Sequence, residues 1–159
     1  MNLWDREINP SEPLLARLTP AQRLAMAVAA LDTAVRTEPE PLRDHAAAQW
    51  ITGAIAAGQA AVVAGAPRIT LPTDLDAAYD DLDATVSEPG VSQLMMGIIS
   101  CADHDELEPT HVTGVLEACF EFTVQRQDPE PDTLEEQQAN ARCLEVIAFQ
   151  KNLVAQATA

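Results

Sequence analysis

Along most of this chain, apolar residues recur every three or four positions, and prolines separate the segments that carry them. The clearest segment begins at Thr19, which precedes Pro20 and stands three residues before Gln22. Thr at the cap, Pro at the first helical position and Gln at the third are typical of a helix start with a capping box. The apolar stripe that follows consists of Leu24, Val28, Leu31 and Val35. This pattern predicts a helix that ends near Thr37, before the prolines of residues 38–41.

The same spacing and the same kind of break predict further helices. Their expected ranges are 42–64, 73–86, 91–102, 110–127 and 133–156. The last begins with a second capping-box match, Thr133 and Glu136. Residues 1–18 contain prolines and no long stripe, so we expect an irregular segment there, with one helical turn at 14–18. No stretch alternates as a strand does. The sequence therefore predicts a single all-α domain over residues 1–159, a bundle or orthogonal array of about six helices.

Only 4% of the residues are aromatic, whereas 47% are hydrophobic and many of these are alanine. A core of this kind requires helix axes that approach closely, and Gly53 and Gly58 in the second predicted helix mark such an approach. Residues 45–67 carry no formal charge, but their alanine, glycine and glutamine content is too high for a membrane span. We therefore expect a buried central helix there, apolar on all sides.

Charge is unevenly distributed along the chain, whose formal net charge is −16. Residues 69–125 contain no lysine and no arginine, and they hold twelve acidic residues. Concentrated negative charge attracts and orients basic partners, and it repels nucleic acids and anionic membranes. We therefore expect a basic protein as the partner, with neither direct nucleic-acid binding nor membrane association.

Within this acidic window, the helix predicted at residues 73–86 has two different faces. Its apolar face consists of Leu75, Ala78, Tyr79, Leu82 and Val86. Asp76, Asp80 and Asp83 lie on the other face, and no base offsets their repulsion of about 0.2–0.5 kcal/mol per pair. Such a row can imitate a phosphate backbone or bind a partner's arginines, and a solvated acidic face that confers solubility is the alternative. The predicted partner-binding residues are Asp76, Asp80, Asp81, Asp83 and Glu88, with Tyr79 as an aromatic anchor.

Sequence motifs for catalysis and metal binding fail when their spacing is checked. No calcium loop fits, because the registers that begin at Asp74 and Asp81 lack the required acids and glycine. One Glu-x-x-His, Glu108 to His111, falls short of the two that a di-iron bundle needs. Buried reduced thiols are the expectation for three cysteines among apolar neighbours, Cys101, Cys119 and Cys143. We predict no catalytic residue, no metal ligand and no cofactor. The first residues do not resemble a signal peptide, so we expect a cytoplasmic location.

These observations favour a binding protein that captures or inhibits a basic protein partner, as immunity proteins, antitoxins and nucleic-acid mimics do. The alternative is a helical enzyme or small-ligand-binding protein, with a pocket lined by the alanine-rich second helix and by Met95–Met96. Self-association into a homo-oligomer, through the face that holds Gly53 and Gly58, is a third hypothesis. No motif in the chain is specific enough to name a family.

Overall fold

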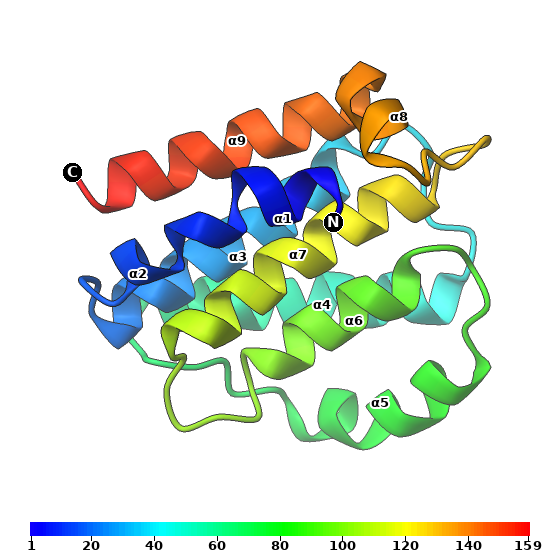
Figure 1. Cartoon of the computed structure of the whole chain (residues 1–159). Helices are drawn as coiled ribbons and strands as arrows, with labels where there is room; N and C mark the ends of the chain where they lie inside the picture. Colours follow the sequence, from blue (N-terminus) through cyan, green and yellow to red (C-terminus); the bar gives the residue numbers. More distant parts are fainter.

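The computed structural model covers residues 1–159 and contains helices but no strands, so the all-α prediction is confirmed. The helices form one compact domain (Figure 1). In chain order they are α1 (Leu3–Glu7), the 3-10 turn η1 (Asn9–Ser11), α2 (Glu12–Leu15), α3 (Pro20–Thr37), α4 (His45–Val63), α5 (Thr73–Thr85), α6 (Val91–Ser100), α7 (Pro109–Gln125), α8 (Leu134–Ala139) and α9 (Ala141–Ala157).

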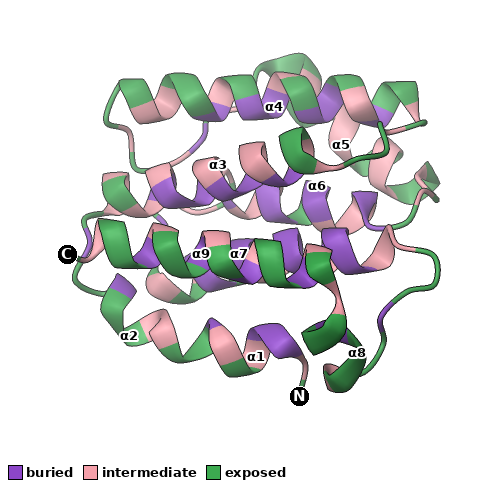
Figure 2. Ribbon diagram, turned by 90° about the horizontal axis from the view of Figure 1, so that it is seen from above, coloured by how far each residue is buried: buried purple, intermediate pink, exposed green.

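The central helix of the bundle is α7. It packs against α2, α3, α6 and α9, and ten of its residues are buried. Among them are Phe120 and Phe122, which together with Trp4 of α1 and Trp50 of α4 supply the largest side chains of a mainly aliphatic core. The outer helices bury one side only (Figure 2). This central helix lies within the acidic window of the sequence, residues 69–125.

The second long helix, α4, lies in the outer layer, so the prediction of a central helix buried on all sides at residues 45–67 is wrong. Trp50 and Ala54 are buried on its inner side, which packs against α3, α5 and α6. Ala56 and Val63 are exposed on its outer side (Figure 2). A buried alanine and an exposed alanine contribute equally to a hydropathy pattern, which explains the error. By length and composition alone, α4 would also be able to cross a membrane.

The glycines of α4 mark close approaches, as the sequence predicts. A methyl group on Gly58 would lie 3.0 Å from Ile69 and 3.1 Å from Val28 of α3. A methyl group on Gly53 would lie 3.0 Å from Leu75 of α5. These contacts occupy the glycine face of α4 within the chain. They also bring α5 against the bundle.

The N-terminal segment contains α1, η1 and α2, so the prediction of an irregular residue range 1–18 is wrong. A capping box starts α1: Asn2 Oδ1 accepts from the backbone N–H of Asp5 at 2.8 Å, and the backbone N–H of Asn2 donates to Asp5 Oδ2 at 2.9 Å. The Trp4 indole N–H donates to Gln150 Oε1 of α9 at 2.9 Å. These helical turns are too short to produce a long periodic pattern of apolar residues, so apolar spacing gave no sign of them.

The predicted helix at 133–156 is divided into α8 and α9 at Asn140. This residue has extended backbone (φ −95°, ψ 119°), and its Oδ1 accepts from the N–H of Cys143 at 2.9 Å. Asparagine caps helices well, and this cap starts a second helix in a new direction. The capping boxes predicted at Thr19 and Thr133 are confirmed.

Candidate functional site

The acidic helix α5 lies along one outer edge of the bundle, on the side opposite α9 (Figure 1). None of its residues is fully buried. Its predicted apolar face is confirmed, since Leu75, Ala78, Tyr79, Leu82 and Val86 all pack against the core. Trp50 of α4 holds the helix by its backbone, because the indole N–H donates to the carbonyl of Leu75 at 2.8 Å. The rings of Trp50 and Tyr79 lie 5.5 Å apart.

The outer face of α5 presents carboxylates that have no basic partner within the chain. Asp74, Asp76, Asp80 and Asp81 are exposed, and none of them takes part in an ion pair. Asp83 is half-buried, and its Oδ1 accepts from the hydroxyl of Ser92 at 2.9 Å. Three of the predicted partner-binding residues are therefore open to solvent, and Asp83 lies at the inner margin of the row.

The loop between α6 and α7 extends this acidic surface. Partial burial raises the pKa of Tyr79, and the negative charges of Asp83, Asp103 and Asp80 raise it further. Asp103 belongs to the loop, so the fold brings this carboxylate to the same phenol as the α5 acids. We name as the acidic edge the residues Asp74, Asp76, Asp80, Asp81, Asp83, Asp103, Asp105 and Glu106. Its one ion pair is a long contact, 4.0 Å between Arg68 Nη1 and Asp105 Oδ1.

Glu88, another predicted partner-binding residue, is largely buried and bonds to other groups of the same chain. Only 10% of its side chain is exposed, and its carboxylate lies 3.3 Å from Arg126 Nη1. It also accepts from the backbone N–H groups of Arg43 at 2.8 Å and Asp44 at 3.3 Å. Burial acts to raise the pKa of Glu88, but these hydrogen bonds and the guanidinium outweigh it and hold the pKa below its ordinary value. Glu88 therefore joins the α5–α6 turn to the α3–α4 linker and the end of α7.

A second group of acids, which the sequence analysis did not single out, lies along the outer face of α7. Burial raises the pKa of Glu117 and of Glu121, and the charge of Asp5 in α1 adds to both shifts. Glu130 raises the pKa of Glu121 as well. These residues come from three distant segments, and the missed helix α1 brings Asp5 to the group. Beside them, a groove between α6 and α7 exposes half of the Met96 surface.

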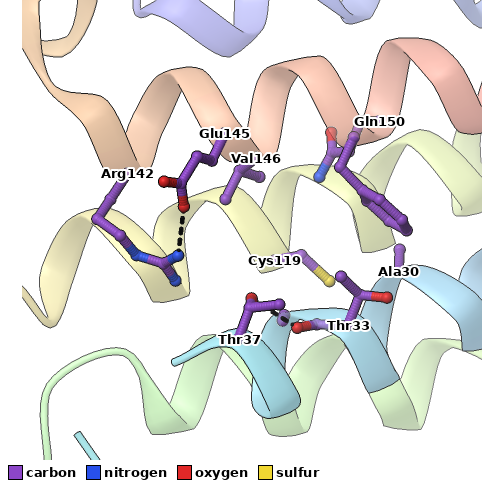
Figure 3. A pocket seen from close by; sticks show the side chains of 10 residues that line it. Ala30, Thr33, Thr37, Cys119, Arg142, Glu145, Val146 and Gln150 are labelled. Carbon is purple, nitrogen blue, oxygen red and sulfur yellow. Dashed lines mark hydrogen bonds and ion pairs between the residues drawn. The ribbon is translucent and has the colours of Figure 1, made fainter. Parts of the chain in front are cut away.

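A cavity of about 140 Å³ lies between α3, α7 and α9, on a different side of the molecule from α5. It is lined mainly by apolar atoms, including those of Ala30, Ala34 and Val146. Figure 3 shows Arg142 and Glu145 of α9 at one end of it, joined by an ion pair of 2.7 Å. The predicted pocket-lining residues do not line this cavity: Met96 lines the groove between α6 and α7, and Ala48, Ile51 and Thr52 of α4 line a separate cleft beside the α3–α4 linker.

The cysteines and histidines form no reactive group. Cys101, Cys119 and Cys143 are free and buried, as the sequence predicts. Burial raises the pKa of the Cys101 thiol to about 12, so this cysteine stays protonated and a poor nucleophile at neutral pH. The imidazole rings of His104 and His111 stack 3.7 Å apart. No group of three or more His, Cys, Asp or Glu side chains is arranged to hold a metal ion.

No family model, curated protein or solved structure matches this chain. The acidic edge and the cavity of α3, α7 and α9 are therefore the features that can indicate a function.

Proposed function

We propose that this protein is a non-catalytic binding protein whose acidic edge captures a basic protein partner. The partner would present arginine or lysine side chains to α5 and to the loop that holds Asp103. Inhibitors, immunity proteins and antitoxins act in this way, and a row of carboxylates on a helix can take the place of a nucleic-acid backbone in a basic cleft.

The observation that carries the proposal is the absence of internal compensation at exposed carboxylates. Asp76, Asp80 and Asp81 make no ion pair, although they repel one another on a single helix. Like charges at four-residue spacing destabilise a helix by about 0.2–0.5 kcal/mol per pair. Arginines elsewhere in the chain are used to pair acids, as Arg126 pairs Glu88 and Glu38. Unpaired charges on α5 thus favour a cation from outside the chain.

A rigid attachment of α5 supports the same proposal. A binding surface loses less entropy on association when its backbone is already held in place. Trp50 fixes the backbone of α5 at Leu75, and Tyr79 lies on the Trp50 ring with part of its surface exposed. Tyr79 is therefore placed to act as the aromatic contact beside the acids, since tyrosine is enriched at the centres of interfaces. Glu88 is not included in the proposed surface.

An affinity measurement on two variants of equal charge tests the proposal. The first variant carries Asp76→Asn, Asp80→Asn and Asp81→Asn. The matched control removes three exposed charges elsewhere and carries Asp128→Asn, Asp132→Asn and Glu135→Gln. The probe is an oligoarginine peptide, titrated calorimetrically at about 0.1 M and about 1 M NaCl, where the Debye length falls from about 10 Å to about 3 Å.

We expect the α5 variant to bind the peptide at least threefold more weakly than the control variant at the lower salt concentration. Exposed ion pairs contribute about 0.2–1 kcal/mol each, so three of them correspond to roughly a 3- to 140-fold change. At about 1 M NaCl the difference should disappear. Equal weakening by both variants would show that net charge alone attracts the peptide, and the proposed surface would then be wrong.

A further inference from the structure

The cavity between α3, α7 and α9 has the size of a known small-ligand site. Its volume is about 140 Å³. An engineered apolar cavity of about 150 Å³ in another protein stays free of water and binds benzene. The apolar walls here are the side chains of Ala30, Ala34, Val146 and Phe149, with Cys119 of α7 between the two ends (Figure 3). The apolar part of an occupant would therefore be about as large as a single small ring.

One polar atom of the wall lacks a partner. Arg142 Nη2 is buried and makes no hydrogen bond, whereas Nη1 of the same side chain donates to Glu145 Oε2 at 2.7 Å. A buried donor without an acceptor keeps the full desolvation penalty, because it has lost water and gained nothing. An acceptor oxygen of a ligand in the cavity would supply the missing bond.

Most of the other polar groups around the cavity already have a hydrogen-bond partner within the chain. Gln150 donates to the carbonyl of Leu116 at 2.8 Å and accepts from Trp4 at 2.9 Å, so both ends of its amide are bonded. The Thr37 hydroxyl donates to the carbonyl of Thr33 at 2.7 Å. Thr33 Oγ1 accepts from Arg36 at 3.3 Å, which leaves its own O–H free to donate. Thr37 Oγ1 and Glu145 Oε1 accept no hydrogen bond within the chain, but the buried polar atom of the wall that has no partner at all is the donor Arg142 Nη2.

The local charge indicates that the acceptor is uncharged. Glu145 already neutralises Arg142, and 63% of the Glu145 side chain is exposed, so the pair lies at the mouth of the cavity. Thr37 is the last residue of α3, and Thr33 lies one turn before it, near the helix end where the dipole places partial negative charge. An anionic ligand would face both Glu145 and this helix end. A neutral oxygen would avoid both repulsions.

We propose that this cavity binds a small uncharged molecule that is apolar except for one hydrogen-bond-accepting oxygen, such as a short ketone or ester. The oxygen accepts from Arg142 Nη2, and the apolar part lies against Ala30, Ala34 and Val146. The site shares no residue with the acidic edge. Binding of the small molecule and capture of a basic partner are therefore separate properties, and variants at one site leave the other intact.

Nuclear magnetic resonance on the whole chain, labelled with ¹³C in the methyl groups of alanine and valine, tests this proposal. Cyclopentanone is the first probe. Methylenecyclopentane has nearly the same shape but carries a CH₂ group in place of the oxygen, and cyclobutanecarboxylate supplies an anion. Saturable shifts are expected at the methyl groups of Ala30, Ala34 and Val146 with cyclopentanone. Methylenecyclopentane should bind at least about 10-fold more weakly, because a hydrogen bond from a charged donor contributes more than one between neutral groups.

Two variants connect the shifts to the cavity. Arg142→Met removes the donor and keeps the apolar stem, so it should abolish the preference for cyclopentanone over methylenecyclopentane. Arg17→Met removes the same charge from an exposed position away from the cavity and should preserve the preference. Ala34→Leu fills the cavity and should prevent binding of all three probes.

Failure of cyclopentanone to give saturable shifts at these methyl groups in the wild-type protein would overturn the proposal. So would tighter binding of the carboxylate than of cyclopentanone, or a preference for cyclopentanone that survives in Arg142→Met. If Ala34→Leu fails to fold by circular dichroism, the comparison of Arg142→Met with Arg17→Met decides the matter alone.

Discussion

Replacing Glu88 by glutamine should destabilise the fold, although sequence analysis grouped this residue with the partner-binding acids. The side chains of Glu38, Glu88 and Arg126 are 8%, 10% and 5% exposed, so water contributes little to their solvation. Glutamine at 88 keeps one acceptor for the N–H of Arg43. It loses the charge that faces Arg126, and it can place an amide donor against the guanidinium. The substitution therefore weakens a junction of three chain segments.

The magnitude follows from the contacts that remain. Breaking a buried ion pair costs about 3–5 kcal/mol when nothing replaces the lost partner. Here Arg126 keeps Glu38 at 3.5 Å and the carbonyl of Glu40 at 2.8 Å. We therefore expect a loss of about 2 kcal/mol in the free energy of unfolding, near the range for one hydrogen bond to a charged group. For a chain of this length that lowers Tm by about 4–8 °C.

Urea unfolding followed by circular dichroism measures this loss, with Asp80→Asn as the control. Asp80 is exposed and unpaired, so its substitution should change stability by less than about 0.5 kcal/mol. The pKa of Glu88 is lowered in the folded protein, so as pH falls below 4.5 the unfolded chain takes up a proton at this residue first. The wild type should therefore lose stability as pH falls from 4.5 to the lower pKa of folded Glu88. Glu88→Gln should lack this part of the pH dependence. A Glu88→Gln protein as stable as the wild type would refute the structural role of the junction.

Two other substitutions test separate parts of the account. Trp50→Phe removes the indole donor to Leu75 and leaves a gap beside the smaller ring, because Trp50 is buried. We expect a loss of about 2 kcal/mol in the free energy of unfolding. Relative to the wild type, hydrogen exchange should accelerate more at the amides of α5 than at those of α7. Glu117→Gln and Glu121→Gln should each raise Tm at pH 7. Burial and neighbouring acids raise the pKa of both carboxylates in the folded protein, so their charged forms are unfavourable there. That gain should vanish below about pH 4, where wild-type carboxylates are protonated in both states.

Local signals in the sequence predicted the elements that local chemistry determines. The start of α3 followed from Thr19, Pro20 and Gln22, and the apolar face of α5 followed from residue spacing alone. The start of α1 uses the same capping chemistry with Asn2 and Asp5, which differ from the threonine paired with glutamine or glutamate at the starts of α3 and α8. Asn140 caps α9 in a stretch without proline or glycine, where residue spacing alone predicts one continuous helix.

Properties that depend on tertiary packing were not available from the sequence. The pattern of α4 is compatible with burial on every side, and only the positions of α3 and α5 decide which alanines meet solvent. Glu88 resembled its acidic neighbours until the fold placed Arg126, 38 residues later in the chain, against it. The cavity required α3, α7 and α9 together. The exposed acids of α5, by contrast, lie where the helical spacing placed them.

The most direct test of the acidic edge is a map of where a cation binds. Backbone amide shifts of the ¹⁵N-labelled protein, recorded during titration with oligoarginine, supply this map. We predict that the largest shifts fall on α5 and on the loop that contains Asp103. Shifts concentrated on α7 around Glu117 and Glu121, or spread evenly over all exposed acids, would contradict a partner site on α5.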